Sequence, residues 1–459
     1  MTTALPPIGW IGIVRLGLIQ AGLGSVVVLT TSLLNRVMVV ELGLLAMLPG
    51  ALVALYYGLQ ILRPRLGYGS DQSGRRTPWI IGGMAVLAIG GIGAALATAW
   101  MNQALIPGIA LAAMSFTLIA LGVGAAGTNL LVLLAKRVEP RRRPAAATIV
   151  WLMMITGFII TTATAGVLLE PFTLTRLVAV SSGVSLVAFV VSVLAVWGVE
   201  GRAEQAFAAG GGDAPAAPGK GAAEAEAATA PFMEALREVW QEPVARQFTL
   251  FVFVSMLAYS AQDLILEPFA GAVFGLTPGQ STQLASMQYG GVLLGMILVG
   301  ALGPRLGSLR TWMLAGCLGA AVMLATLATA GSIGEAFPLR PVVFLLGVAL
   351  GTFAVAAIGS MMSLVDAGRE QREGIRMGLF GAAQAIAFGV GGLLATAGID
   401  LLRWLLDSAL IAYSAVFLAE ALTFLVAAVL AIRVGNLAES RRRLDIHKAG
   451  DGYAAGLGT

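Results

Sequence analysis

The sequence predicts an all-α integral membrane protein whose twelve transmembrane helices form two six-helix pseudo-repeats. Three observations predict this fold class: the composition, the distribution of basic residues and an internal repeat. The chain of 459 residues is 58% hydrophobic and only 11% charged, with a mean hydropathy of +0.89. A water-soluble chain of this length needs more polar surface than these charged residues supply. We therefore expect the chain to lie in a membrane.

Apolar runs long enough to cross a bilayer recur along the whole chain. The hydrocarbon core needs about 20 apolar residues per helix. The predicted spans are 16–34, 44–62, 79–99, 105–134, 148–169, 177–198, 247–268, 284–303, 311–331, 341–365, 377–398 and 409–432. The N-terminus lacks the pattern of a cleaved signal peptide, so the first run is expected to remain as the first span.

Basic residues are distributed unequally between the two sides that twelve spans define. With the N-terminus inside, 24 of the 28 Lys and Arg residues fall in inside segments. The four outside are Arg36, Arg176, Arg340 and Arg403. Because cytoplasmic loops carry the excess of Lys and Arg, both termini are predicted to be cytoplasmic. Orientation thus explains the basic pI of about 9.4 without nucleic acid as a partner.

A change in composition separates the sixth span from the seventh. The segment 200–245 begins with an Ala/Gly/Pro-rich stretch typical of a flexible cytoplasmic linker. It ends with "PFMEALREVWQEP", which predicts a short amphipathic helix near 231–241, lying on the membrane surface or docking a partner. The predicted units are an N-terminal six-helix bundle 1–199, the linker 200–245, a C-terminal six-helix bundle 246–435 and a cytoplasmic tail 436–459.

The two halves share a short repeated sequence. "PRLG" follows the second span at 64–67 and follows the eighth span at 304–307, an offset of 240 residues. Two six-span halves joined by a cytoplasmic linker resemble the architecture of the major facilitator superfamily.

The loop between the second and third spans resembles a motif of that superfamily, G-x-x-x-D-x-x-G-[RK]-[RK]. Its residues here are Gly67, Asp71, Gly74, Arg75 and Arg76. Glycines permit a tight turn at the membrane face. An Asp near a helix N-terminus, with Arg close by, can latch neighbouring helices together. The motif either controls conformational change or only fixes topology and packs the loop.

Charges inside apolar spans are costly and usually mark a site. Asp263 and Glu267 lie four residues apart in the seventh run and share a helix face. Counted from Arg246 at 1.5 Å per residue, Asp263 is about 26 Å along the helix, towards its periplasmic end. Pro268 is expected to end or kink this helix. The acids are either an interfacial pair or a contact for a ligand or partner.

The first predicted outside loop adds Asn35, Arg36 and Glu41 at the same membrane level. Other polar residues in the spans are neutral or near a span end and are expected to form interhelical hydrogen bonds. They are Gln20, Gln60, Asn129, Gln288, Gln384 and Glu420. The space between the halves is therefore predicted to be apolar, which suits a hydrophobic molecule better than a sugar or an amino acid.

No catalytic or metal site is predicted. The only histidine is His447 and the only cysteine is Cys317, so the chain has neither a zinc-ligand set nor a Cys/His pair in its spans. We therefore expect the chain not to be an enzyme. Two glycine pairs at positions 291/295 and 347/351 predict close helix contacts, within the chain or across a homodimer.

Three stretches resemble the PucC/LhaA family more closely than the superfamily at large. They are "RLGLIQAGLGSVVVLTTSLLNRVMVVEL", "PRLGYGSDQSGRRTPWIIGGM" and "AQDLILEPFAGAVFGLTPGQST". This family is the bacteriochlorophyll-delivery branch of the major facilitator superfamily in purple phototrophic bacteria. The resemblance extends from about Arg15 to the last span.

The resemblance implies a light-harvesting complex assembly factor in the bacterial inner, photosynthetic intracytoplasmic membrane. Such a protein binds bacteriochlorophyll and delivers it to antenna polypeptides of the core LH1 or peripheral LH2 complex, or scaffolds their helices. The implied partners are antenna polypeptides, the reaction centre–antenna complex, a pigment-synthesis enzyme and membrane lipids. The alternative is a proton-coupled secondary transporter of a small hydrophobic solute, which the position of the acids disfavours.

The implied pigment raises a question of magnesium ligation. Antenna proteins ligate the magnesium of bacteriochlorophyll with histidine, whereas the spans here contain none. Magnesium is a hard cation that accepts oxygen ligands. We hypothesise a periplasmic-side contact with pigment or antenna helices. Its residues would be Asn35, Arg36, Glu41, Gln262, Asp263 and Glu267.

Overall fold

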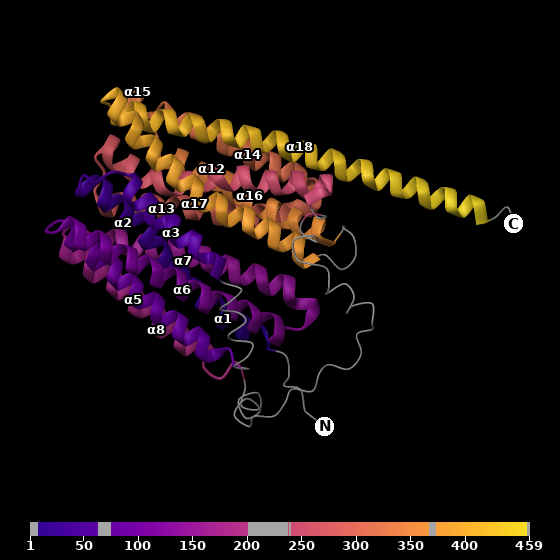
Figure 1. The fold of residues 1–459 in the computed structure, drawn as a ribbon, viewed down its shortest axis with the longest axis horizontal. Helices are drawn as coiled ribbons and strands as arrows, with labels where there is room; N and C mark the ends of the chain where they lie inside the picture. The colour runs from indigo at the N-terminus through magenta and orange to yellow at the C-terminus, as the bar shows by residue number, and fades with distance from the viewer. Residues whose placement is uncertain (1–7, 63–74, 201–236, 238–239, 367–372, 457–459) are drawn as a thin grey trace.

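A computed structural model describes residues 8–62, 75–200, 237, 240–366 and 373–456 (Figure 1). The regular structure of these residues is helical throughout. Eleven helices are long and apolar enough to cross a membrane, and a shorter apolar helix, Met47–Leu62, covers the second predicted span. The prediction of an all-α membrane protein is therefore confirmed.

The N-terminal half contains six of these helices. Its first span is a continuous helix, Trp10–Glu41, composed of α1 (Trp10–Val28), η1 (Leu29–Leu33), α2 (Leu34–Arg36) and η2 (Val37–Glu41). The others are α3 (Met47–Leu59) continued by η3 (Gln60–Leu62), α5 (Thr77–Met101), α6 (Leu105–Arg137), α7 (Arg143–Leu168, preceded by η4, Pro140–Arg142) and α8 (Leu174–Val196).

The C-terminal half contains the other six. They are α12 (Pro243–Phe274), α13 (Pro278–Leu306), α14 (Leu309–Ala328) with the short α15 (Ala330–Ile333) and η5 (Gly334–Ala336), α16 (Leu339–Asp366), α17 (Glu373–Leu406) and α18 (Ala409–Gly456). In Figure 1, the two halves lie side by side as indigo-to-magenta and pink-to-yellow groups of helices. The start of α1 and the end of α18 lie at the same end of the bundle (Figure 1).

Each half has its own hydrophobic core. One core is composed of buried residues up to position 199 together with Leu264. The other is composed mainly of residues from 244 onwards. The halves meet where α7 packs on α13 and where α3 packs on α17. The first span also packs on α12, so the residues predicted to form the site lie where the halves meet.

Of the two outcomes expected for Pro268, an end or a kink, the structure excludes an end of the helix. The helix α12 continues through Pro268 and ends at Phe274, where Gly275 takes the left-handed conformation (φ 65°). Proline lacks an N–H and therefore leaves the carbonyl of residue i−4, here Leu264, without its helical hydrogen bond. The Asn35 side-chain Nδ2 donates to that Leu264 oxygen at 2.5 Å. A neighbouring helix thus satisfies the carbonyl, which allows the proline inside a membrane helix.

Two predicted helix ends also differ from those in the structure. Asn35, Arg36 and Glu41 were placed in an outside loop but belong to the first helix, because the bundle supplies partners for their polar groups. The last helix α18 continues without a break past the predicted boundary at 435. Most of the predicted linker, including nearly all of its amphipathic helix near 231–241, lies outside the described residues.

The two glycine pairs pack against each other within the chain. Gly291 and Gly295 of α13 lie against the backbone of α16, while Gly347 and Gly351 of α16 lie against the backbone of α13. A Cβ at any of these positions would collide with a main-chain oxygen of the facing helix. The close contact therefore joins two helices of the C-terminal half, and the glycines are not free to form a homodimer.

Adjacent glycines on α13 give a matched test of this contact. A Cβ on Gly291 would meet the carbonyl oxygen of Phe344, whereas a Cβ on Gly290 has nothing within 4 Å. We expect Gly291→Ala to lower the free energy of unfolding by about 1–3 kcal/mol through overpacking. Gly290→Ala should raise it by about 0.5–1 kcal/mol. Unfolding of the purified protein in detergent measures both, and equal effects would contradict the contact.

Candidate functional site between the two halves

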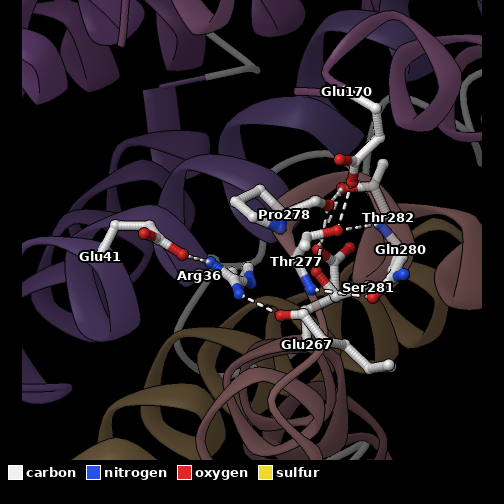
Figure 2. Close-up of polar contacts among 10 residues, drawn as sticks. Arg36, Glu41, Glu170, Glu267, Thr277, Pro278, Gln280, Ser281 and Thr282 are labelled. Carbon is white, nitrogen blue, oxygen red and sulfur yellow. Dashed lines mark hydrogen bonds and ion pairs between the residues drawn. The ribbon is translucent and has the colours of Figure 1, made fainter. Parts of the chain in front are cut away.

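Arg36 is the largest fully buried polar side chain at the junction of the halves, with 1% of its surface exposed. Its Nη1 lies 2.6 Å from Glu41 Oε1, and its Nη2 donates to the carbonyl oxygen of Leu276 in the C-terminal half. Figure 2 shows Arg36 reaching from the first helix between Glu41 and the α12–α13 connection. The guanidinium therefore joins the two halves.

Glu267 lies beside this pair and is also buried. Its carboxylate accepts a hydrogen bond from Ser32 Oγ of the first helix and one at 3.4 Å from Thr282 Oγ1 of α13. We call Ser32, Asn35, Arg36, Glu41 and Glu267 the outer polar cluster. Buried polar groups need such partners because an unpaired one costs free energy, so this cluster fixes the first helix against α12.

Two further contacts join the halves at the same end. Thr277 Oγ1 donates to the Glu170 carboxylate at the end of α7, as Figure 2 shows. The Asp400 carboxylate of α17 accepts the backbone N–H groups of Ala46 (2.9 Å) and Met47 (2.7 Å) at the start of α3. A carboxylate at a helix N-terminus satisfies donors that have no intrahelical partner. Hydrogen bonds thus join the two halves at the end of the bundle opposite the start of α1 and the end of α18, which we call the outer end.

Asp263 lies one helical turn further from this end, among aromatic rings from both halves. Tyr57 of α3 and Tyr259 of α12 both contact the ring of Phe388, with centroids 5.0 and 5.8 Å apart. Phe158 of α7 contacts the ring of Tyr289, with centroids 5.0 Å apart. Asp263 lies near Tyr259 and Tyr289.

We call Tyr57, Phe158, Tyr259, Tyr289 and Phe388 the central aromatic group. All except Tyr289 are partly exposed, as is Asp263, so both ring surface and a carboxylate oxygen remain accessible. Sequence reasoning missed this group. Tyrosines in the interior of apolar spans were the available signal, because a buried phenol needs a partner for its hydroxyl.

The structure divides the six predicted site residues into three environments. Asn35, Arg36, Glu41 and Glu267 come together in the outer polar cluster. Asp263 is half-buried beside the central aromatic group. Gln262 is fully buried, with neither side-chain polar atom hydrogen-bonded. Residues adjacent on a helix point about 100° apart, so neighbours in sequence need not share a site.

The loop motif between the second and third spans is only partly described. Gly67, Asp71 and Gly74 lie outside the described residues. Arg76 is buried, and its Nη1 donates to Asn129 Oδ1 at 3.1 Å. The carboxylate of Glu200 accepts the backbone N–H of Arg76 and, at 2.9 Å, that of Thr77. Glu200 therefore caps α5, a contact that sequence reasoning missed.

Comparison with known proteins settles the family. A sequence model of the family described as "PUCC protein" matches residues 33–438. The chain belongs to the PUCC family. A PUCC relative from Rhodobacter capsulatus, named "Bacteriochlorophyll synthase 44.5 kDa chain", is 50% identical, with 93% of this chain and 96% of the relative covered. "Protein PucC" of Cereibacter sphaeroides is 27% identical, with 86% and 84% covered.

Solved structures show that this PUCC protein has the major facilitator superfamily fold. A crystal structure of the peptide transporter POT in complex with sulfate has a TM-score of 0.66 at 15% identity, covering 94% of this chain and 97% of that one. An inward-facing, unoccupied bacterial homologue of the lysosomal transporter Spinster has a TM-score of 0.65 at 15% identity, covering 93% and 96%. At such identities the likeness is one of fold alone.

Proposed function

We propose that this chain is a photosynthetic membrane protein that binds bacteriochlorophyll as cargo between its halves and passes it to light-harvesting antenna polypeptides. The observation that carries the proposal is Asp263, a half-buried carboxylate beside aromatic rings from both halves. Aromatic faces suit a flat macrocycle, and a carboxylate oxygen suits its magnesium. The name of the Rhodobacter capsulatus relative supports the link to this pigment.

The residues present fit a pigment that already contains its metal. Among the described residues, no group of three or more His, Cys, Asp or Glu could hold a metal ion. A magnesium already held by macrocycle nitrogens needs only one axial ligand from the protein, which Asp263 can offer. A single carboxylate holds the metal less firmly than a complete ligand set, and weak retention favours transfer to the next protein.

Carriage of pigment distinguishes this role from catalysis and from coupled transport. We propose a non-catalytic protein, although the relative's name contains the word synthase. The proposed partners are antenna polypeptides of the LH1 or LH2 complex, with the reaction centre–antenna complex and the pigment-synthesis enzyme as further contacts. We propose that the protein lies in the photosynthetic membrane with both termini in the cytoplasm, because 24 of its 28 basic residues then lie inside.

An absorption spectrum of the purified protein tests the proposal. The protein is purified in mild detergent from a pigment-making phototroph, and co-purifying polypeptides are identified by mass. We expect about one bacteriochlorophyll per chain in fractions free of antenna polypeptides. A colourless protein that brings antenna helices with it would replace the carrier with a scaffold. Flux of a solute driven by a pH gradient, without bound pigment, would replace it with a transporter.

A further inference from the structure

Two buried polar side chains in the C-terminal half have no hydrogen-bond partner. Gln262 of α12 is 0% exposed and Glu420 of α18 is 4% exposed. Neither the amide nitrogen and oxygen of Gln262 nor the two carboxylate oxygens of Glu420 are hydrogen-bonded. Glu420 was expected to form an interhelical hydrogen bond, and none is present in the structure. Four unpaired polar atoms at membrane depth need a physical explanation.

The ring contacts of α12 and α18, with the helical repeat, place these two side chains at a similar level on the facing sides of the two helices. The ring centroids of Phe269 and Tyr413 are 5.7 Å apart. Gln262 lies seven residues before Phe269, and Glu420 lies seven residues after Tyr413. Seven residues are two helical turns, about 10.5 Å, and return to nearly the same face. Because α12 and α18 run in opposite directions, both steps lead to the same level on the facing sides.

The surroundings of this pair are apolar and sealed. Glu420 lies between Phe417, which contacts Phe269 (4.9 Å between centroids), and Phe424, which contacts Phe353 (6.0 Å). Gly331 of α15 lies against Leu410, and Arg310 at the start of α14 donates to the Ile432 carbonyl. These contacts place buried alanines of α14, at positions 320 and 321, level with Glu420. The described neighbours of Glu420 on α14 are thus small apolar side chains that offer it no hydrogen bond.

No described cation neutralises Glu420 from the helices packed against α18. Their ionisable residues lie at other levels. Arg246 and Arg310 lie near the inner end, as does the first turn of α17 with Glu373 and Arg376, whereas Asp400 and Arg403 lie near the outer end. Asp263 and Tyr259 lie beside the central aromatic group, Glu267 in the outer polar cluster and Cys317 among core residues of α14. On α18 itself, Tyr413 is two turns away and Arg433 lies near the inner end. An ionised carboxylate here would be both buried and unpaired, which is unfavourable.

We infer that Glu420 and Gln262 form a proton-binding site that clamps α12 to α18. When Glu420 takes up one proton from water, its O–H can donate to Gln262 Oε1 while Gln262 Nε2 donates to the other carboxyl oxygen. This acid–amide pairing gives each of the four unpaired atoms a partner. Release of the proton to water removes the donor and sets a carboxylate oxygen against the amide oxygen. The clamp therefore holds only in the protonated state.

Infrared spectroscopy of the full-length protein tests the site, because the C=O stretch of a protonated carboxylic acid is separate from carboxylate and amide bands. We expect the wild type at pH 7 to have an acid C=O band that Glu420→Gln removes. Gln262→Leu should keep this band at a shifted position, because the acid loses its hydrogen-bond partner. Asp407→Asn, which removes an exposed carboxyl group, should leave the band unchanged. A spectrum unaltered by Glu420→Gln would overturn the proposal.

Thermal unfolding provides a second readout that does not depend on one variant. Glu420→Gln keeps an amide–amide pair in place of the acid–amide pair, so its unfolding midpoint at pH 7 should match that of the wild type. Glu420→Leu leaves the Gln262 amide without a hydrogen-bond partner, so this variant should unfold at a lower temperature. A wild-type midpoint that rises with added Na⁺, but not in Glu420→Gln, would show a metal-cation site and overturn the proton site.

Discussion

Asp263→Leu is expected to bind bacteriochlorophyll at least about tenfold more weakly than the wild type, a loss of about 1.4 kcal/mol or more. The substitution removes the one accessible carboxylate beside the central aromatic group, and leucine offers no oxygen to magnesium. Titration of the purified protein with bacteriochlorophyll in detergent, followed by near-infrared absorption, measures the affinity. The fold should survive, because a half-buried carboxylate is replaced by an apolar side chain of similar size.

Two further variants separate ligation from charge. Asp263→Asn keeps a side-chain oxygen without the charge and should bind pigment with intermediate affinity. Asp407→Asn removes a carboxylate at an exposed position, far along the chain from the aromatic group, and should bind as the wild type does. If Asp263→Leu binds pigment as tightly as Asp407→Asn, Asp263 is not the ligand, and the pigment must be held by other groups.

Helix positions and the division into halves could be predicted because they depend on local composition. An apolar run of about 20 residues fits a bilayer wherever it occurs in a chain, so the spans were found one by one. Cys317, which lies inside the ninth predicted span, is buried. The paired glycines also gave a correct signal of close contact, although only the structure shows that α13 and α16 provide the two sides.

The candidate site could be predicted only in part, because its contacts join residues far apart in the sequence. Pro268 alone predicts either an end or a kink of α12, and the donor that lets the helix continue is Asn35 on the first helix. The charge of Arg36 alone predicts a loop, whereas Glu41 and the Leu276 carbonyl hold it inside the bundle. In each case a local rule failed because a distant segment satisfied the polar group.

The neighbouring residues Gln262 and Asp263 illustrate a second limit. Both were assigned to one site because both are polar and lie in one span. The helix directs Asp263 towards the central aromatic group and Gln262 into the core of the C-terminal half. The direction of each side chain depends on the rotation of α12 about its axis, which packing against α17 and α18 sets. The rotation of α12 about its axis could not be predicted from a single sequence.

Arg36→Leu is expected to lower the free energy of unfolding by about 2–4 kcal/mol. Removing one partner of a buried ion pair leaves the other uncompensated, and here the Leu276 carbonyl also loses its donor. The loss is smaller than for a fully buried pair because the Glu41 side chain is 33% exposed. Arg142→Leu is the matched control: Arg142 pairs with Glu139 at 3.4 Å, but both are exposed, and such pairs contribute about 1 kcal/mol or less.

The same substitution should also loosen the outer end of the bundle. Ala46 is 2% exposed, and its N–H contacts Asp400 across the halves, so a thiol introduced by Ala46→Cys reports local opening. The native Cys317 is fully buried and should react slowly. In the Arg36→Leu background we expect labelling at least about tenfold faster, which corresponds to a local opening free energy lowered by about 1.4 kcal/mol. Unchanged labelling, with unfolding no different from Arg142→Leu, would mean that the hydrogen bonds of Glu267 and Asp400 hold the halves together without Arg36.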